Sequence, residues 1–220
     1  MNIYECILEL KESTYFSSRE INNFFQTEPL IGNYALCYAL SFCQSPYNDY
    51  GKVLYKDKEH LPKLIEKDIY VTPLTFIDKV NFTITQFNGL GDGYFNQMEK
   101  ASWNYPQIGR IKMLSLGNRG KFYIISKEEL IKPAYIRLGK FMSKAKVNYK
   151  KLKWEKLELQ TKTIPFLLNP CDIPEHELLI YDMINIKPVP LIKNATLKGD
   201  FYELENKEYL PMNMKFRIDD

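Results

Sequence analysis

The sequence predicts an α+β fold in which a small mixed sheet carries a helix on one face. The N-terminal segment IYECILEL alternates between apolar and polar residues with one slip in phase, which is typical of a half-buried strand. Residues 27–46 contain a run that is apolar nearly all round, which favours a buried helix. Much of the remaining chain shows strand patterns separated by glycine or proline, and this combination indicates the α+β class.

The predicted helix has a start signal and a stop signal. Thr27 is the expected N-cap, and Pro29 lies near the first helical turn. Ser45 and Pro46 end the apolar run. Gly32 falls inside the first turn, where we expect it to allow close approach of another backbone segment.

Three strand patterns follow the helix. VNFTITQF, residues 80–87, alternates cleanly and ends at NGLGDG, which we expect to be a turn. A phosphate-binding loop is disfavoured there because the glycines do not complete GxGxxG and no GK[ST] follows. IGRIKMLSL and KFYIIS are expected to form a hairpin across the turn GNRG, residues 117–120.

The domain prediction divides the chain after residue 156. Residues 1–156 form the core with its basic hairpin region, and residues 157–220 form a β-rich segment packed on that core. The second part has three strand candidates: PFLL, HELLIYDMINI and MKFRI. In the first part, residues 46–68 are expected to be a loop or small insertion. One single domain over 1–220 is the alternative.

Composition excludes several classes of protein. No apolar run approaches the roughly 18–20 residues that cross a bilayer. Glu5 and Glu9 interrupt the start of the chain, where a secretion signal would need an apolar core. We therefore expect a cytoplasmic protein without a membrane partner. The four cysteines form no CxxC pair and are accompanied by two histidines, so free thiols are expected, with no metal and no cofactor.

Positive charge is concentrated in one quarter of the chain. Residues 107–156 carry a net charge of +11, whereas the segments before and after them each carry −4. Charge asymmetry of this kind indicates a polyanion partner, and a lysine-rich solvated face is the simpler alternative.

Cations spaced along strands and turns can follow a phosphate backbone, and exposed aromatic rings can stack on unpaired bases. The candidate phosphate contacts are Arg110, Lys112, Arg119, Lys121, Arg137, Lys140, Lys144 and Lys146. Lys144 and Lys146 are expected to share one strand face. Tyr135 and Phe141 are the candidate stacking residues.

No catalytic constellation stands out. His60 and His176 both lie in charged stretches, and carboxylate pairs such as Glu175 and Glu177 have the spacing of an ordinary solvated strand face. A non-catalytic role is therefore predicted. Two alternatives remain: a metal-independent RNA endonuclease with His60 or His176 as general base, and an interaction module whose lysines bind an acidic protein.

Three blocks of the sequence carry a family resemblance. GNYALCYAL follows the first strand, IGRIKMLSLGNRGKF lies in the middle, and YIRLGKFMSKAKV comes after it. In this order, and at this chain length, they resemble the Cas-five-type (Csc-one) family of type I-D CRISPR surveillance (Cascade) complexes, within the RAMP superfamily.

The resemblance implies a fold and a role. The fold would be a ferredoxin-like or RRM-like β-α-β-β-α-β core with an inserted hairpin and a β-rich C-terminal part. The chain would cap the 5′ handle of the CRISPR RNA and contact the large subunit and the adjacent backbone subunit. It would meet target DNA only indirectly, in prokaryotic antiviral defence. Neither IYECILEL nor KFYIIS has the RNA-binding signature of an isolated RRM, so we expect recognition by loops, the hairpin and phosphate contacts.

Overall fold

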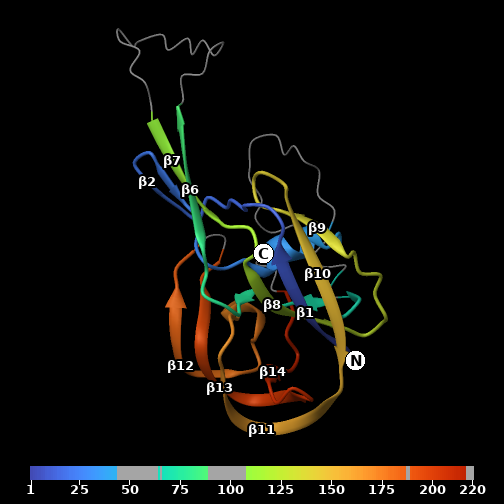
Figure 1. Cartoon of the computed structure of the whole chain (residues 1–220). Coiled ribbons are helices and arrows are strands. Elements are labelled where there is room, and N and C mark those ends of the chain that lie inside the picture. The colour runs from blue at the N-terminus through green and yellow to red at the C-terminus, as the bar shows by residue number, and fades with distance from the viewer. Residues whose placement is uncertain (44–63, 65, 89–107, 187–188, 217–220) are drawn as a thin grey trace.

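Three β-sheets and the α-helix α1 are the main elements in the part of the chain that the structure describes (Figure 1). The computed structural model describes residues 1–43, 64, 66–88, 108–186 and 189–216. Within these ranges the molecule is mostly β, so the predicted share of helix was too large.

The first sheet has six strands, and β1 (Asn2–Leu10) lies at its centre. β1 pairs antiparallel with β8 (Arg119–Ser126) on one side and β10 (Ser143–Leu152) on the other. The outer strands are β4 (Tyr70–Val71) and β5 (Thr75–Phe76), which pair with β8, and β9 (Tyr135–Leu138), which pairs with β10. Tyr4, Cys6, Leu8 and Leu10 are buried along β1, which confirms the strand predicted from their alternation.

The helix α1 (Asn33–Ala39) is shorter than predicted. Its N-cap is Gly32, which offers no side-chain cap, and Leu40 is its C-cap. Thr27 was therefore wrongly predicted as the cap: its hydroxyl donates to the carbonyl of Phe16 at 2.8 Å and accepts from the amide of Phe16 at 3.0 Å. The predicted close approach at Gly32 is also wrong, because no atom lies within 4 Å of where a Cβ would stand. The stop at Ser45-Pro46 lies outside the described residues.

The second sheet forms an arm that extends away from the first (Figure 1). Its strands, in spatial order, are β2 (Arg19–Ile21), β3 (Phe24–Gln26), β7 (Ile108–Leu114) and β6 (Phe82–Asn88). The predicted hairpin of IGRIKMLSL with KFYIIS is wrong, because β7 pairs with β6 and β3 whereas β8 pairs within the first sheet. NGLGDG falls almost wholly outside the described residues.

The turn after β7 explains why these two strands separate. Gly117 has a positive φ of 82°, and the side chain of Asn118 donates to the carbonyls of Asn81 and Ser115 at 2.8 and 2.9 Å. Asn118 thus ties the turn to the start of β6 instead of closing a hairpin. The chain leaves the arm at this turn and enters the first sheet.

The third sheet contains the C-terminal strands. β13 (Leu191–Leu204) lies between β11 (Trp154–Ile164) and β12 (Glu177–Ile184), and β14 (Tyr209–Pro211) also pairs with β13. β11 begins two residues after β10 ends, so the chain passes almost directly from the first sheet into the third. The predicted domain boundary after residue 156 falls inside β11.

Buried residues of the first sheet, α1 and the third sheet belong to one hydrophobic core cluster.

The strand predicted at HELLIYDMINI is present as β12, whereas PFLL contributes an isolated bridge at Leu168 and precedes the short 3-10 turn η1 (Pro170–Asp172). The described part of MKFRI forms no strand. The ferredoxin-like order of elements is not confirmed, because α1 is the one α-helix that the structure describes along its length; Leu64 and Glu66 are also helical. In the same ranges, no helix is long and apolar enough to cross a membrane.

Candidate nucleic-acid interface

The register of the first sheet gathers most of the predicted basic residues on one face. Along β1, Glu5, Ile7 and Glu9 point away from the buried side chains of that strand, since successive residues alternate between faces. We call the face that carries these residues and their cross-strand neighbours the outer face. Residues directly opposite one another in antiparallel strands share a face, so the pairing register gives its composition.

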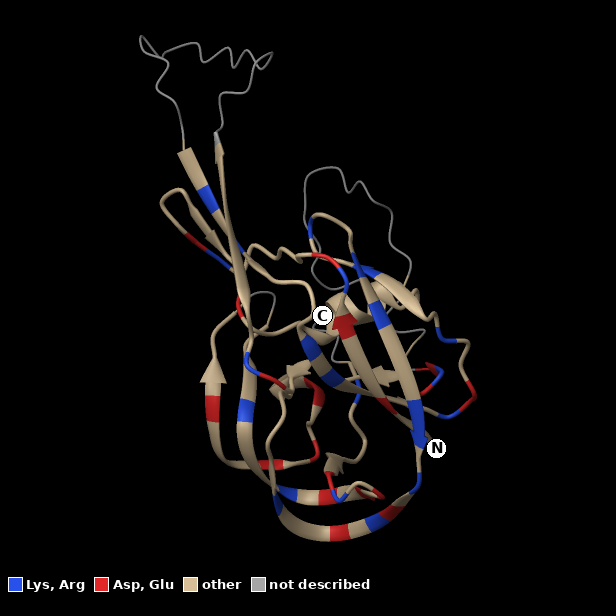
Figure 2. Cartoon of the chain, in the orientation of Figure 1, with Lys and Arg blue, Asp and Glu red and all other residues tan. Residues whose placement is uncertain are grey.

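The outer face is arranged in rows across the strands. Arg119 of β8, Glu9 of β1, Lys146 of β10 and Tyr135 of β9 form one row. Lys144 and Arg137 form the next row, at the edge made by β10 and β9. Lys121, Ile7 and Asn148 form the row on the other side, followed by Tyr123, Glu5 and Lys150. Figure 2 shows these basic bands on β8 and β10 on either side of the acidic band on β1.

Six of the ten predicted site residues therefore share this face: Arg119, Lys121, Arg137, Lys144, Lys146 and Tyr135. Lys140 and Phe141 lie in the turn between β9 and β10, beside the same edge. Arg110 and Lys112 lie elsewhere, on β7 of the arm. The sequence prediction of a shared face for Lys144 and Lys146 agrees with the register.

One end of the outer face is covered by an acidic turn, residues 205–208, which connects β13 and β14. Glu208 forms an ion pair with Lys121 and accepts a hydrogen bond from the hydroxyl of Tyr123. Glu205 lies 2.8 Å from Lys150 Nζ, an ion pair that lowers the carboxyl pKa and raises the pKa of the lysine. Lys121 is thus already paired with a carboxylate, and its side chain is 18% exposed, so it is poorly placed to bind an external anion.

The turn also places an amide over the central strand. Asn206 Nδ2 donates to Glu5 Oε2 at 2.8 Å and to the hydroxyl oxygen of Tyr123 at 3.2 Å. Burial and the neighbouring Glu208 raise the pKa of Tyr123 well above its usual value of 10.0, so this hydroxyl remains a donor. These contacts close this end of the outer face to a ligand.

The other end remains open and basic. We call the rows of Arg119, Glu9, Lys146, Tyr135, Lys144 and Arg137 the open end. Among the described residues, Arg119, Lys144 and Lys146 form no ion pair within 4 Å, while Arg137 lies 3.7 Å from Glu12 with both side chains more than half exposed. An exposed pair at that distance contributes little, so four cations of the open end can meet an external anion.

Glu9 supplies the carboxylate in the middle of the open end, and the nearby Lys11 binds it. Glu9 Oε1 accepts a hydrogen bond from Lys11 Nζ at 2.5 Å, and this bond lowers the carboxyl pKa below its usual range. Lys144 and Lys146 flank the phenol ring of Tyr135: Lys146 lies directly opposite it, and Lys144 Nζ lies 4.5 Å from the ring centroid.

Both predicted stacking residues are on the surface. Tyr135 is 51% exposed and Phe141 is 56% exposed, so neither serves as a core residue. The Phe141 ring packs against Tyr15 at 5.1 Å between centroids, which leaves one of its faces accessible. On the arm, Lys112 Nζ lies over the ring of Phe82 at 4.0 Å.

Comparison with known proteins identifies the family. The family model described as type I-D CRISPR-associated protein Cas5/Csc1 matches residues 1–219. The chain belongs to this family. The match confirms the resemblance seen in the three sequence blocks, and it makes the chain a subunit of a type I-D CRISPR effector complex.

Two other comparisons add little. A chain in the solved structure titled "Cryo-EM structure of the Type III-B Cmr-beta bound to cognate target RNA and AMPPnP, state 1" is similar at a TM-score of 0.41 and 11% identity. That alignment covers 88% of this chain and 86% of the other. The comparison with curated proteins finds no match.

His60 and His176 are the candidate general bases of this Cas5/Csc1 family member. His60 lies outside the described residues. His176 is 8% exposed, its Nε2 lies 2.7 Å from the carbonyl oxygen of Asp200, and its ring packs on Phe201. These contacts give His176 a packing role between β12 and β13.

The described cysteines and acidic residues form neither a reactive thiol site nor a metal site. The four cysteines form no disulfide, and burial raises the pKa of Cys6 and Cys37 well above the usual thiol value, which keeps them protonated and unreactive. No group of histidine, cysteine and acidic side chains large enough to hold a metal ion occurs in that part of the chain.

Sequence reasoning missed the acidic side of this surface. Glu5 and Glu9 on the central strand, and Glu205 and Glu208 in the acidic turn, decide which cations are accessible. The two-residue period of IYECILEL placed Glu5 and Glu9 on one face, and that signal was available. Nothing in the sequence showed that residues 205–208 fold onto β8.

Proposed function

We propose that this chain binds the repeat-derived 5′ handle of the CRISPR RNA as a non-catalytic subunit of the type I-D effector complex. Family membership supports the setting, and the open end of the outer face supports the interaction. The observation that carries the proposal is the row of Lys144 and Arg137 beside the row of Lys146 and Tyr135, all on one face of the sheet.

The chemistry of this surface fits single-stranded RNA. Alternate residues along a strand stand about 6.8 Å apart and neighbouring strands about 4.8 Å apart, so the four cations form a compact grid of charge. Flexible lysines neutralise phosphates without reading sequence, and the exposed rings of Tyr135 and Phe141 offer stacking platforms. Lys140, in the turn beside Phe141, extends the grid at the same edge.

The arm provides a second group of contacts in this proposal. Arg110 and Lys112 lie two residues apart on β7 and therefore point to the same side of that strand. Their separation from the outer face implies a contact with a different stretch of RNA. We further propose that the six-stranded sheet with α1 is this chain's form of the RAMP core, and that its partners include the large subunit and the adjacent backbone subunit.

The direct test is to purify the complex without high salt and sequence the small RNA that it retains. Photo-crosslinking then locates the contact: 4-thiouridine placed in the handle should crosslink to peptides containing residues 135–146. Crosslinks confined to other subunits would contradict the proposal. Incubation of the purified chain with repeat RNA in EDTA tests the endonuclease alternative, for which discrete cleavage would be the supporting result.

A further inference from the structure

β12 is an edge strand with an unusual surface. It pairs with β13 on one side, and within the described part of the chain nothing pairs with its other side (Figure 1). Four of its large apolar side chains, Leu179, Ile180, Tyr181 and Met183, are between 41% and 71% exposed. An edge strand presents a row of unpaired backbone donors and acceptors, so long apolar edges are usually blocked in free proteins.

The opposite edge of the same sheet shows the usual protection. β11 carries four charged residues: Glu155, Lys156, Glu158 and Lys162. β12 carries two charged residues, Glu177 and Asp182, and neither lysine nor proline. Both strands have register shifts in their pairing with β13, so the difference between the two edges lies in their charge. The contrast indicates that the β12 edge is covered by another chain in the functional state.

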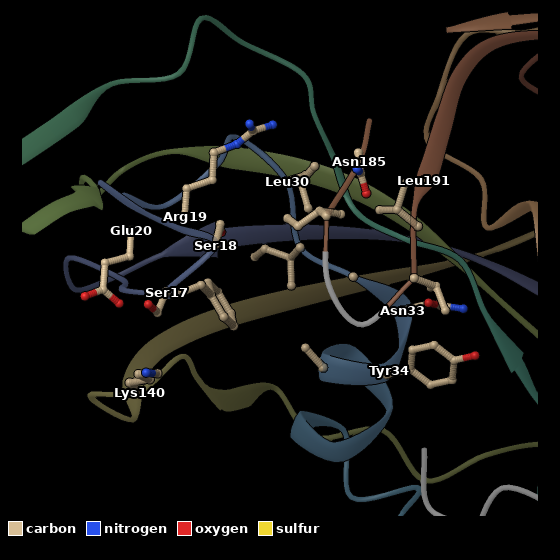
Figure 3. A pocket seen from close by; sticks show the side chains of 16 residues that line it. Ser17, Ser18, Arg19, Glu20, Leu30, Asn33, Tyr34, Lys140, Asn185 and Leu191 are labelled. Atoms are coloured by element: carbon tan, nitrogen blue, oxygen red, sulfur yellow. The ribbon is translucent and has the colours of Figure 1, made fainter. Parts of the chain in front are cut away.

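A cavity lies at the end of this strand. After Ile184 the chain continues into Asn185 and Ile186, which line a cavity of about 790 Å³ together with residues such as Leu30 and Leu191. In Figure 3, Leu30, Asn185 and Leu191 gather at one end of the cavity, and Arg19, Glu20 and Lys140 at the other. A strand that follows β12 toward its C-terminal end would reach the apolar end of the cavity.

We propose that β12 is the docking edge for an extended segment of another protein subunit. The segment adds as a strand along β12 and places a large apolar side chain in the cavity beside Leu30 and Leu191. This is strand addition, in which backbone hydrogen bonds supply affinity and side-chain pockets supply specificity. That the partner is another subunit of the CRISPR complex rests on the proposed function.

Charge favours a different chain over a second copy of this one. Residues 173–186 contain Glu175, Glu177 and Asp182 and no lysine or arginine. Glu177 has Lys198 Nζ at 3.9 Å, whereas Asp182 accepts from the neutral amide of Asn194 at 2.8 Å. Two copies paired through β12 would bring like charges together, so the fitting segment is apolar with basic residues at its flanks.

Hydrogen exchange of the full chain, alone and in the assembled type I-D complex, tests this inference. Amides of residues 177–184 should exchange at least about tenfold more slowly in the complex, whereas the edge amides of β11 should change little. Unchanged exchange along β12 would overturn the proposal. RNA crosslinking on the same complex tests the RNA-binding proposal separately. If crosslinking fails while β12 is protected from exchange, the RNA-binding proposal is wrong and the β12 assignment stands.

A pair of variants supplies the matched control. Ile180→Lys puts a charge on the β12 edge, and Leu159→Lys does the same on β11, where Leu159 is 78% exposed. Since Ile180 is 71% exposed, both variants should keep the melting temperature of the parent. Ile180→Lys should reduce co-purification of the other subunits about tenfold, and Leu159→Lys should not. Equal recovery for both would contradict the proposal, as would native mass spectra showing a dimer that Ile180→Lys dissolves.

Discussion

Lys146 lies directly opposite Glu9 in the antiparallel pair of β10 and β1, yet the carboxylate bonds to Lys11 instead. Arg119 lies opposite Glu9 from the other neighbouring strand. The carboxylate of Glu9 is therefore neutralised by Lys11, which lies just after the end of β1. Lys146 and Arg119 are left accessible on either side of it, and this arrangement makes the open end an anion-binding surface.

Removing the charge of Glu9 should tighten RNA binding. Glu9→Gln frees Lys11 and removes the one carboxylate between Lys146 and Arg119, which should raise affinity for handle RNA about three- to fivefold at low salt. The gain should shrink as salt screens the charges. Fluorescence anisotropy at two salt concentrations measures it, with Glu155→Gln on β11 as the control. Weaker binding by Glu9→Gln would show that the carboxylate helps to hold the RNA.

Breaking the ion pair under the acidic turn should destabilise the fold. Lys121 and Glu208 have side chains that are 18% and 25% exposed, so Glu208→Gln leaves a largely buried lysine without its counter-charge. We expect a loss of about 1–3 kcal/mol in the free energy of unfolding, measured by urea denaturation. Glu177→Gln removes an exposed pair with Lys198 and should cost less than about 0.5 kcal/mol. Equal effects would refute the burial argument.

Stability should fall at alkaline pH. Burial raises the pKa of Tyr70 and Tyr123 above the usual 10.0, so the folded chain keeps protons that the unfolded chain loses. Their contribution is fully present below pH 10 and is lost as the pH rises through the folded pKa values. Urea unfolding at pH 8 and pH 11 should show this loss. Tyr123→Phe should reduce the difference between the two pH values, and an unchanged difference would contradict the assignment to Tyr123.

His176 should matter for stability and not for RNA cleavage. His176→Gln removes the ring that packs on Phe201 and bonds to the Asp200 carbonyl, which should cost about 1–3 kcal/mol of unfolding free energy. Repeat RNA incubated with the parent protein in EDTA should stay intact on a denaturing gel. Specific cleavage that His176→Gln abolishes would instead support the endonuclease, and the same assay with His60→Ala covers the other histidine.

The sequence predicted where strands occur better than it predicted which strands pair with one another. The alternation of IYECILEL reports burial of alternate residues, and β1 is the central strand of its sheet. The hairpin prediction failed because a glycine-bounded turn fixes only local geometry. Asn118 anchors that turn to Asn81, 37 residues away, and sends β7 and β8 into different sheets.

The same limit applies to the candidate site. Spacing alone placed Lys144 and Lys146 on one face, because both lie on one strand. Whether Arg119 and Lys121 belong to that face depended on the pairing of β8 with β1, and whether Lys121 is accessible depended on Glu208. The longest strand, β13, was also missed, since Asn194 with positive φ and Gly199 interrupt its alternation.

The salt dependence of handle RNA binding tests the central claim most directly. With about five phosphates contacted, the logarithm of the binding constant should fall against the logarithm of salt concentration with a slope near −3.5. Lys144→Ala combined with Lys146→Ala should make that slope shallower by about one to two, and Lys198→Ala, on the third sheet, should leave it unchanged. A double variant with the slope of the parent would contradict the assignment of RNA binding to the open end of the outer face.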